Sequence, residues 1–201
     1  MVHEGLKIIS RGQKLEEADK AVIMLHGRGA TAESIIQLSS KLPEAAYIAP
    51  QAENREWYPK SFMEPRENNQ PHLDSALGEL DTLVQETVEK VGRENLFLLG
   101  FSQGACLGSE YVASNPEKYG GLIILSGGLI GEKAEAFEGD LEQTHVFIGC
   151  SDKDPHIPLE RVEETVQVVE KLNGDVEKYI MQGSHHGIVD YEVEKIREML
   201  S

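Results

Sequence analysis

Cysteine is scarce in this chain of 201 residues, and long hydrophobic runs are missing. The two cysteines, Cys106 and Cys150, are too few for the disulfide framework of a secreted scaffold, so we expect free buried thiols. No apolar run approaches the roughly 20 residues of a membrane span, and residues 1–17 lack the pattern of a signal peptide. These absences exclude a disulfide scaffold and an integral membrane protein, and they predict a cytoplasmic location.

Positive charge is also in short supply. The chain has 19 lysine and arginine residues against 35 acidic ones, which gives a formal net charge of −16. Such a charge opposes binding to nucleic-acid phosphates and to anionic membrane surfaces. The acids are spread over helical stretches such as 159–171 and 191–200, which is typical of solvated helix faces rather than of an acidic tail. We therefore expect neither a nucleic-acid partner nor stable membrane insertion.

What the chain does contain is a regular alternation of short apolar runs and amphipathic runs over one domain, residues 1–201. Most apolar runs are almost continuously hydrophobic, as expected for parallel strands that are covered on both faces. They predict strands at residues 21–25, 45–50, 95–101, 121–127, 145–150 and 176–183, with an edge strand at 5–10. Helical periodicity is found at residues 73–92, with Asp74 as the cap, and at 102–116, 158–174 and 191–200. This order predicts an α/β fold with a mainly parallel sheet.

The segment 51–72 fits neither pattern. It has no clear period and is interrupted by prolines. A loop of this length in a compact domain is usually functional or disordered. Ligands of α/β folds bind at the carboxyl ends of the strands, so we expect this segment to form the rim or a partial lid of a site there.

A serine between two glycines, Gly100-Phe101-Ser102-Gln103-Gly104, stands where a predicted strand meets a predicted helix. In the pattern G-x-S-x-G the serine occupies a strained strand-to-helix turn, and the flanking glycines avoid clashes there. Its hydroxyl then projects above the sheet at the start of the helix. The pentapeptide alone is weak evidence, but its place between strand and helix predicts that Ser102 is a nucleophile.

A serine nucleophile needs a base and an acid, which in this arrangement follow in the order serine, acid, histidine. For the acid, Asp154 is preferred over Asp152 because Pro155 stiffens its turn, whereas Asp152 could bond the loop. For the base, His186 is preferred over His185 because Gly187 lets the loop turn the imidazole inward. The sequence therefore predicts a triad of Ser102, Asp154 and His186.

Two backbone N–H groups should stabilise the oxyanion of an acyl-transfer reaction. One is the N–H of Gln103, directly after the nucleophile, and the other is the N–H of Arg28 in the glycine-containing loop after strand 21–25. A phosphate-binding loop is excluded there, since neither G-x-G-x-x-G nor a following Lys-Ser/Thr pair is present. The Arg28 side chain is expected at the mouth of the site, where it could steer an anionic substrate.

These motifs, in this order and spacing, resemble the phospholipase/carboxylesterase family of the α/β-hydrolases. The resemblance is carried by LHGRGA (25–30), GFSQGA (100–105), SDKDPHIP (151–158) and GSHHGI (183–188), and it covers residues 20–200. It implies an α/β-hydrolase fold with helices on both faces of the sheet and no large lid domain. It also implies Trp57 and Tyr58 as substrate-binding residues, although Trp57 could equally be a loop anchor packed on the core.

The expected function is therefore a serine carboxylic-ester hydrolase that acts on small-molecule esters through an acyl-enzyme, without metal or organic cofactor. Short- to medium-chain esters are favoured because many thioesterase relatives carry leucine and an acidic residue where Arg28 and Ala30 stand here. A thioesterase or lysophospholipase acting on longer acyl chains is the alternative. A non-catalytic binding protein with the same fold is the least favoured reading, since no catalytic residue is missing.

Overall fold

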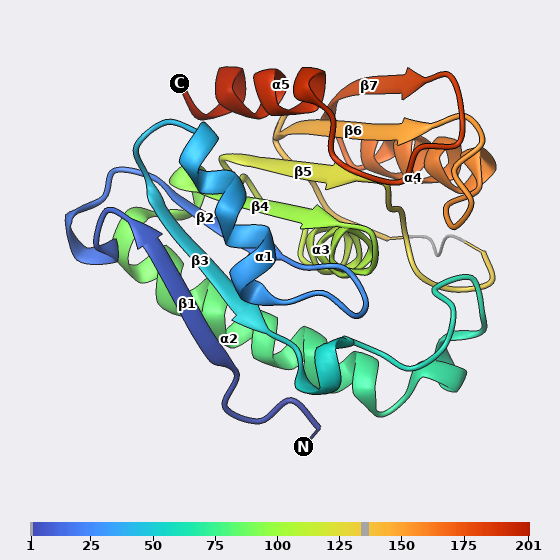
Figure 1. Ribbon diagram of the computed structural model, residues 1–201, viewed down its shortest axis with the longest axis horizontal. Coiled ribbons are helices and arrows are strands. Elements are labelled where there is room, and N and C mark those ends of the chain that lie inside the picture. The colour runs from blue at the N-terminus through green and yellow to red at the C-terminus, as the bar shows by residue number, and fades with distance from the viewer. Residues whose placement is uncertain (1, 134–136) are drawn as a thin grey trace.

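The protein was analysed as a computed structural model, which describes residues 2–133 and 137–201. Its centre is a seven-stranded sheet in the order β1-β3-β2-β4-β5-β6-β7 (Figure 1). Only β1 runs antiparallel to its neighbour β3, and the other neighbouring pairs are parallel. The strands are β1 (Lys7–Gly12), β2 (Ala21–Leu25), β3 (Ala46–Gln51), β4 (Leu96–Phe101), β5 (Gly121–Leu125), β6 (His145–Ser151) and β7 (Asp175–Met181). The mainly parallel sheet predicted from the apolar runs is confirmed.

Helices cover both faces of this sheet, so the domain has three layers (Figure 1). The α-helices are α1 (Ala32–Ile36), α2 (His72–Val91), α3 (Gln103–Ser114), α4 (Leu159–Lys171) and α5 (Asp190–Leu200). Residues of α1 and α5 pack with Val22 and Met24 of β2 in one apolar cluster, while residues of α2, α3 and α4 pack with Ile23 and Leu25 in the other. Successive β2 side chains thus enter opposite cores, because side chains alternate across a strand.

Two details differ from the expectation. Helix α2 begins at His72 with Pro71 at its N-cap position, so Asp74 lies in the first turn and does not cap the helix. A proline at the N-cap position has no N–H to satisfy, and an acidic residue in the first turn still suits the helix dipole. Strand β5 ends at Leu125, because Ser126 takes a positive φ of 49° and turns the chain out of the sheet.

The segment after β3 remains mostly irregular. It contains the short 3₁₀ turns Glu53–Arg55 and Arg66–Asn69 and otherwise runs without regular structure to α2. No large inserted lid domain is found among the residues described. Arg66 is bound to the buried carboxylate of Glu110 in α3, which ties the segment to the body of the domain.

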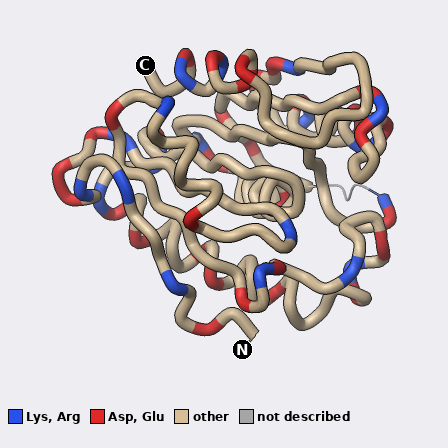
Figure 2. The backbone as a smooth tube through the Cα atoms, in the orientation of Figure 1, with Lys and Arg blue, Asp and Glu red and all other residues tan. Residues whose placement is uncertain are grey.

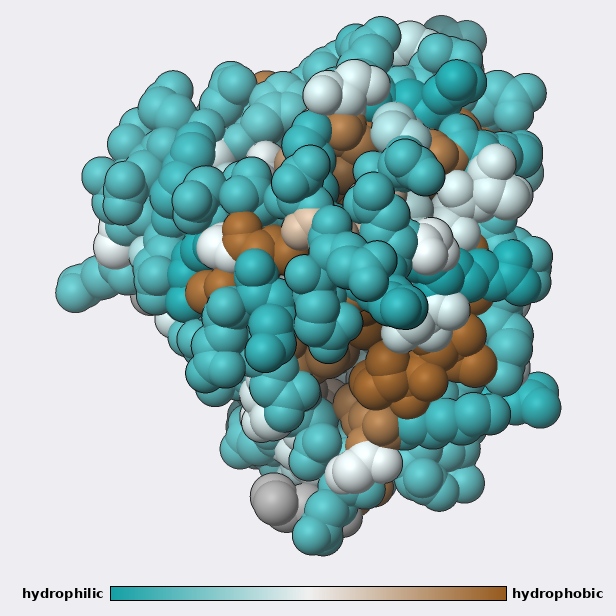
Figure 3. Space-filling view, turned by 90° about the vertical axis from the view of Figure 1, so that its left-hand side faces the viewer, coloured by the Kyte–Doolittle hydropathy of each residue, from teal (hydrophilic) through white to brown (hydrophobic). Residues whose placement is uncertain are grey.

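The charges and apolar groups of the surface follow the pattern expected for a negatively charged globular domain. Acidic and basic residues are interspersed along the chain rather than gathered in one tail (Figure 2). The face opposite the carboxyl ends of the parallel strands is largely hydrophilic, with apolar side chains exposed in several separate areas, the largest at the lower right (Figure 3). None of the described helices is long and apolar enough to cross a membrane.

Candidate active site

Ser102 lies at a sharp turn between β4 and α3. Its backbone has φ 54° and ψ −122°, a conformation that costs a non-glycine residue of order 1–3 kcal/mol. The two flanking glycines make the turn possible. A side chain on Gly100 would come within 2.5 Å of the Ala105 Cα, and one on Gly104 would come within 2.6 Å of the His26 carbonyl oxygen. The strained serine is thus raised at the carboxyl end of the sheet, as the motif predicts.

The three residues of the predicted triad meet in space. Ser102 Oγ lies 3.0 Å from His186 Nε2, and His186 Nδ1 lies 2.8 Å from Asp154 Oδ2. They follow β4, β6 and β7, whose carboxyl ends lie at the same edge of the sheet. With Nδ1–H donated to the carboxylate, Nε2 is free to accept the serine proton. This arrangement can activate a hydroxyl nucleophile.

Asp154 is fully buried at its side chain, but its carboxylate is well supplied with donors. Oδ1 accepts hydrogen bonds from the N–H groups of His156 (2.9 Å) and Ile157 (3.0 Å). Burial by itself raises the pKa of Asp154, but the hydrogen bonds from His186, His156 and Ile157 outweigh it and hold the pKa below its usual value. Asp154 therefore stays ionised and can stabilise a protonated His186.

Asp152 and His185, the less favoured candidates for the acid and the base, have other roles in the structure. Asp152 Oδ1 accepts a hydrogen bond of 2.8 Å from the Gly183 N–H, which joins the loop after β6 to the loop after β7. The His185 carbonyl accepts a hydrogen bond of 2.5 Å from Ser151 Oγ, while the His185 side chain is exposed. Both contacts hold the loop that carries His186.

The two predicted oxyanion donors lie beside Ser102. Gln103 is the first residue of α3, and the first N–H groups of a helix have no partner within it. Arg28 lies in the turn after β2, and both residues line the same cavity as Ser102. The Arg28 guanidinium is already engaged, since it donates to Glu56 and to three backbone carbonyls. From the sequence we expected this side chain to steer an anionic substrate. In the structure the Glu56 carboxylate lies 3.0 Å from the guanidinium and offsets its charge.

The cavity above the triad measures about 660 Å³. Its walls are mainly apolar and aromatic, with a few polar groups near Ser102. Of the two residues expected to bind substrate, Tyr58 lines this cavity and Trp57 does not. The lining residues are Gly27, Arg28, Ala30, Tyr58, Pro59, Lys60, Ser61, Phe62, Phe101, Ser102, Gln103, Cys106, His156, Ile157 and His186.

Trp57 is completely buried behind the cavity wall. Its Nε1–H donates a 2.9 Å hydrogen bond to the His26 carbonyl, and its ring lies 5.1 Å from the His26 imidazole. The His26 ring is itself fixed, because Nδ1 lies 2.8 Å from the Gly27 carbonyl and Nε2 accepts from the Ala52 N–H. This placement is that of a loop anchor, which was the alternative for Trp57.

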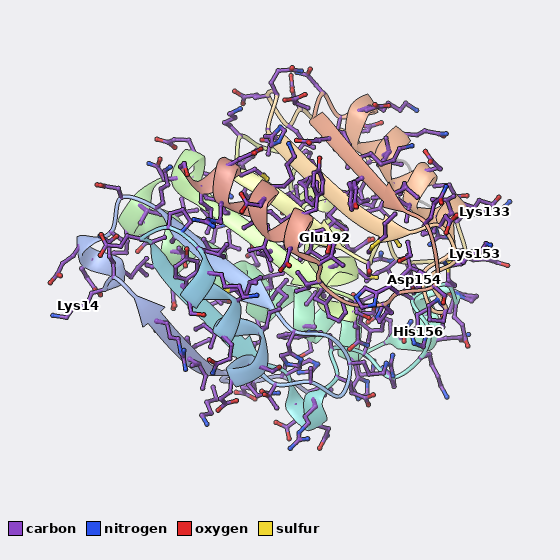
Figure 4. The ribbon with its side chains drawn as sticks, turned by 45° about the horizontal axis from the view of Figure 1, so that its top comes forward. Lys14, Lys133, Lys153, Asp154, His156 and Glu192 are labelled. Atoms are coloured by element: carbon purple, nitrogen blue, oxygen red, sulfur yellow. The ribbon has the colours of Figure 1, made fainter. Side chains whose placement is uncertain are left out.

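Sequence reasoning missed several residues of the cavity. His156 packs edge-on against His186 at 4.8 Å between ring centres, and it lies with Asp154 at the same end of the sheet (Figure 4). Its place two residues after the acid could have indicated this. Phe62 could not be placed, because the segment 51–72 has no period. Cys106 also reaches the cavity, but burial raises the pKa of its thiol to about 12, so it stays protonated.

No group of three or more His, Cys, Asp and Glu side chains is arranged to hold a metal ion within residues 2–133 and 137–201.

Sequence comparison adds the decisive observation. A profile of the phospholipase/carboxylesterase family matches residues 4–201, nearly the whole chain. The chain belongs to the phospholipase/carboxylesterase family. It is similar, at 44% identity, to a phospholipase/carboxylesterase from Dyadobacter fermentans whose crystal structure superposes with a TM-score of 0.94, over 98% of this chain and 97% of that one. The family and this match indicate an ester-bond hydrolase with the α/β-hydrolase fold, and the resemblance inferred from the motifs is confirmed.

Other relatives of this phospholipase/carboxylesterase family member are more distant. Acyl-protein thioesterase 1 of Kluyveromyces lactis is 33% identical over 103 residues, which are 49% of this chain and 45% of the yeast protein. The match thus spans under half the length of that relative. A Bacillus cereus carboxylesterase structure, 21% identical with a TM-score of 0.79 over 98% of this chain and 94% of that one, shares the fold.

Proposed function

We propose that this protein is a serine carboxylic-ester hydrolase that uses Ser102, His186 and Asp154 as its catalytic triad. The observation that carries the proposal is the hydrogen-bonded series from Ser102 Oγ through His186 to the buried Asp154 carboxylate, set in a strained strand-to-helix turn. Structural turns do not require all these features together. An activated serine does.

The geometry supports the following reaction. Ser102 Oγ attacks the ester carbonyl carbon while His186 Nε2 takes the serine proton. The negative oxygen of the tetrahedral intermediate is stabilised by the N–H groups of Arg28 and Gln103. His186 then gives the proton to the leaving oxygen, and an acyl-enzyme on Ser102 remains. Water, activated by the same imidazole, releases the acid and restores the serine.

The cavity supports short- to medium-chain acyl groups. Its volume of about 660 Å³ and its apolar inner wall, formed by residues such as Phe62 and Ile157, suit a small substrate. Thioester hydrolysis is the second candidate, because the yeast relative is named an acyl-protein thioesterase and the same groups would serve a sulfur leaving group.

The test is hydrolysis of p-nitrophenyl esters from acetyl to palmitoyl. We expect activity to peak at acetyl to octanoyl, and Ser102→Ala to lower kcat by about 10⁵-fold or more. Asp154→Asn should lower kcat by about 10⁴-fold, because the imidazole loses its orienting acceptor. Ser114→Ala, at the exposed end of the same helix, is the matched control and should behave as wild type. A wild type that neither cleaves these esters nor binds a fluorophosphonate probe covalently contradicts the proposal.

A further inference from the structure

The two residues proposed to form the oxyanion hole share a second property. The side chains of Arg28 and Gln103 both make hydrogen bonds to the same short segment, residues 56–60, of which residues 58–60 line the cavity. Arg28 follows β2 and Gln103 begins α3, so two separate elements hold one segment.

The Arg28 guanidinium spans nearly the whole segment. Nη1 donates to Glu56 Oε2 at 3.0 Å and to the Pro59 carbonyl at 2.8 Å. Nη2 donates to the Tyr58 carbonyl at 2.9 Å and to the Lys60 carbonyl at 2.5 Å. Four N–H donors of one guanidinium thus bind four acceptors. Because the guanidinium is planar and rigid, it loses little conformational entropy for each hydrogen bond that it forms. A surface arginine that only solubilised the protein would not converge on three backbone carbonyls.

Gln103 holds the segment from the other side. Its Oε1 accepts from the Trp57 N–H at 2.9 Å, and its Nε2 donates to the Tyr58 carbonyl at 2.8 Å. The Gln103 side chain is buried, so both bonds are made away from water. The Tyr58 carbonyl therefore receives donors from Arg28 and from Gln103 and joins the two side chains.

Two further hydrogen bonds complete the connection. The Gly29 N–H donates to the Arg55 carbonyl at 2.7 Å, and Trp57 Nε1–H donates to the His26 carbonyl at 2.9 Å. The loop that carries the Arg28 N–H is thus bonded to residues 55–60 on both sides of Arg28.

From these contacts we infer that Arg28 and Gln103 are positioning residues through their side chains: together with Glu56–Lys60 they form a clasp that holds the two oxyanion N–H groups in register with the cavity wall. The inference rests on the proposed function for its catalytic consequence. The clasp links the geometry of the hole to the position of Tyr58, so a loosened segment weakens oxyanion stabilisation for every acyl group. Changes in the residues of the clasp should therefore alter kcat for all substrates, and not only the binding of long acyl chains.

The chain provides its own reporter for this arrangement. Trp57 is its single tryptophan and lies fully buried inside the clasp. Its emission and its quenching by acrylamide therefore report on the clasp without any substrate. The variants are Arg28→Met, which keeps the length and removes all donors, Arg28→Lys, which keeps the charge without the fork, and Gln103→Glu, which places a carboxylate oxygen against the Tyr58 carbonyl. Arg11→Met is the matched control, since the side chain of Arg11 on β1 is exposed and bonds Gln37 across the surface, away from the cavity lining.

We expect Arg28→Met and Gln103→Glu to raise the quenching constant of Trp57 about twofold, because a freed loop segment opens to solvent. They should lower kcat about tenfold, by a similar factor for p-nitrophenyl acetate and hexanoate, with KM changed less than about threefold. Arg28→Lys should recover part of both losses, and Arg11→Met should match wild type. Melting curves confirm that each variant is folded at the assay temperature, and Arg28→Lys and Gln103→Glu carry the test if Arg28→Met is not.

Three results would overturn the inference. Wild-type quenching in Arg28→Met and Gln103→Glu would show that these side chains do not hold the segment. Increased quenching with an unchanged kcat, or a loss confined to hexanoate, would show that the segment shapes only the wall and not the hole. If wild type cleaves no ester at all, the proposed function fails, and the fluorescence measurements alone still decide whether the clasp exists.

Discussion

Glu192 is a carboxylic acid placed in the interior of the molecule. It is fully buried at the start of α5, near the carboxyl end of the sheet (Figure 4). Oε2 accepts a 2.9 Å hydrogen bond from the Val189 N–H, while Oε1 has no hydrogen-bond partner among the described residues. A side chain on Gly149 of β6 would overlap Oε1, so Glu192 packs directly on that strand. Burial raises the pKa of Glu192 to about 7, opposed by the Val189 hydrogen bond.

This pKa predicts how stability depends on pH. The folded state holds the Glu192 proton more tightly than the unfolded chain does, so this group favours folding below about pH 4.5, and that contribution is lost as pH rises to about 7. A shift of this size corresponds to about 3 kcal/mol. Glu192→Gln keeps an acceptor for the Val189 N–H but cannot ionise. We therefore expect the difference in urea-unfolding free energy between Glu192→Gln and wild type to increase, in favour of the variant, by up to that amount between pH 5 and pH 8.

The control for this measurement is Glu194→Gln, an exposed position on the same helix whose carboxylate lies 3.6 Å from Arg197. It should follow the wild-type pH dependence. Equal pH dependence in wild type and Glu192→Gln would mean that Glu192 does not titrate in this range.

At the scale of elements, the turn between β4 and α3 depends on close approach of backbones. Helix α3 begins so near the end of β2 that a side chain on Gly104 would overlap the Leu25 carbonyl oxygen. Backbone cannot yield as a flexible side chain can, so both elements would have to separate. For Gly78, in the middle of α2, no atom of the described residues beyond its chain neighbours and the backbone of its own helix lies within 4 Å of the place where a side chain would begin.

The two glycines therefore predict opposite effects of the same substitution. Gly104→Ala should destabilise the protein by about 2–4 kcal/mol and abolish ester hydrolysis, because the start of α3 and the Ser102 turn must shift. Gly78→Ala should stabilise it by about 0.5–1 kcal/mol, since alanine lowers the entropy of the unfolded chain and fits the helix. Thermal unfolding of both variants measures this. A Gly104→Ala protein as stable as wild type would contradict the close packing of α3 on β2.

The sequence predicted most elements whose conformation is determined by nearby residues. It did not predict the contacts that depend on tertiary packing. Strands β2 and β4 were predicted because strands buried on both faces must be continuously apolar, and the Ser102 turn because its glycines are required locally. The helix after Thr31 was not predicted, although Thr31 and Ser34 form a capping box there. The engagement of Arg28 could not be foreseen, since its partners belong to an irregular segment whose path is set by tertiary packing.

The whole molecule carries a net charge of −16, and its acids and bases are interspersed along the chain (Figure 2). Like charges repel one another more strongly in the compact state than in the expanded chain, and salt screens this repulsion over about 10 Å at 0.1 M. We expect the melting temperature to rise by a few degrees, about 3–5 °C, between 20 mM and 500 mM KCl at pH 7.5. Choline chloride at equal ionic strength should act similarly. A melting temperature that falls with salt would indicate that attractive ion pairs dominate instead.

The order in which the triad residues follow one another along the chain has a consequence for protein synthesis. The nucleophile follows β4 near the middle of the sequence, whereas the base follows β7, the last strand to be added to the sheet. A ribosome that stalls after residue 174 yields a chain that contains Ser102 and Asp154 but neither β7 nor His186. On the proposed mechanism, such unfinished chains have no base for their serine. Hydrolytic activity during translation would therefore report only on chains that extend past β7 and His186, and the time at which it appears would measure how quickly β7 joins the edge of the sheet.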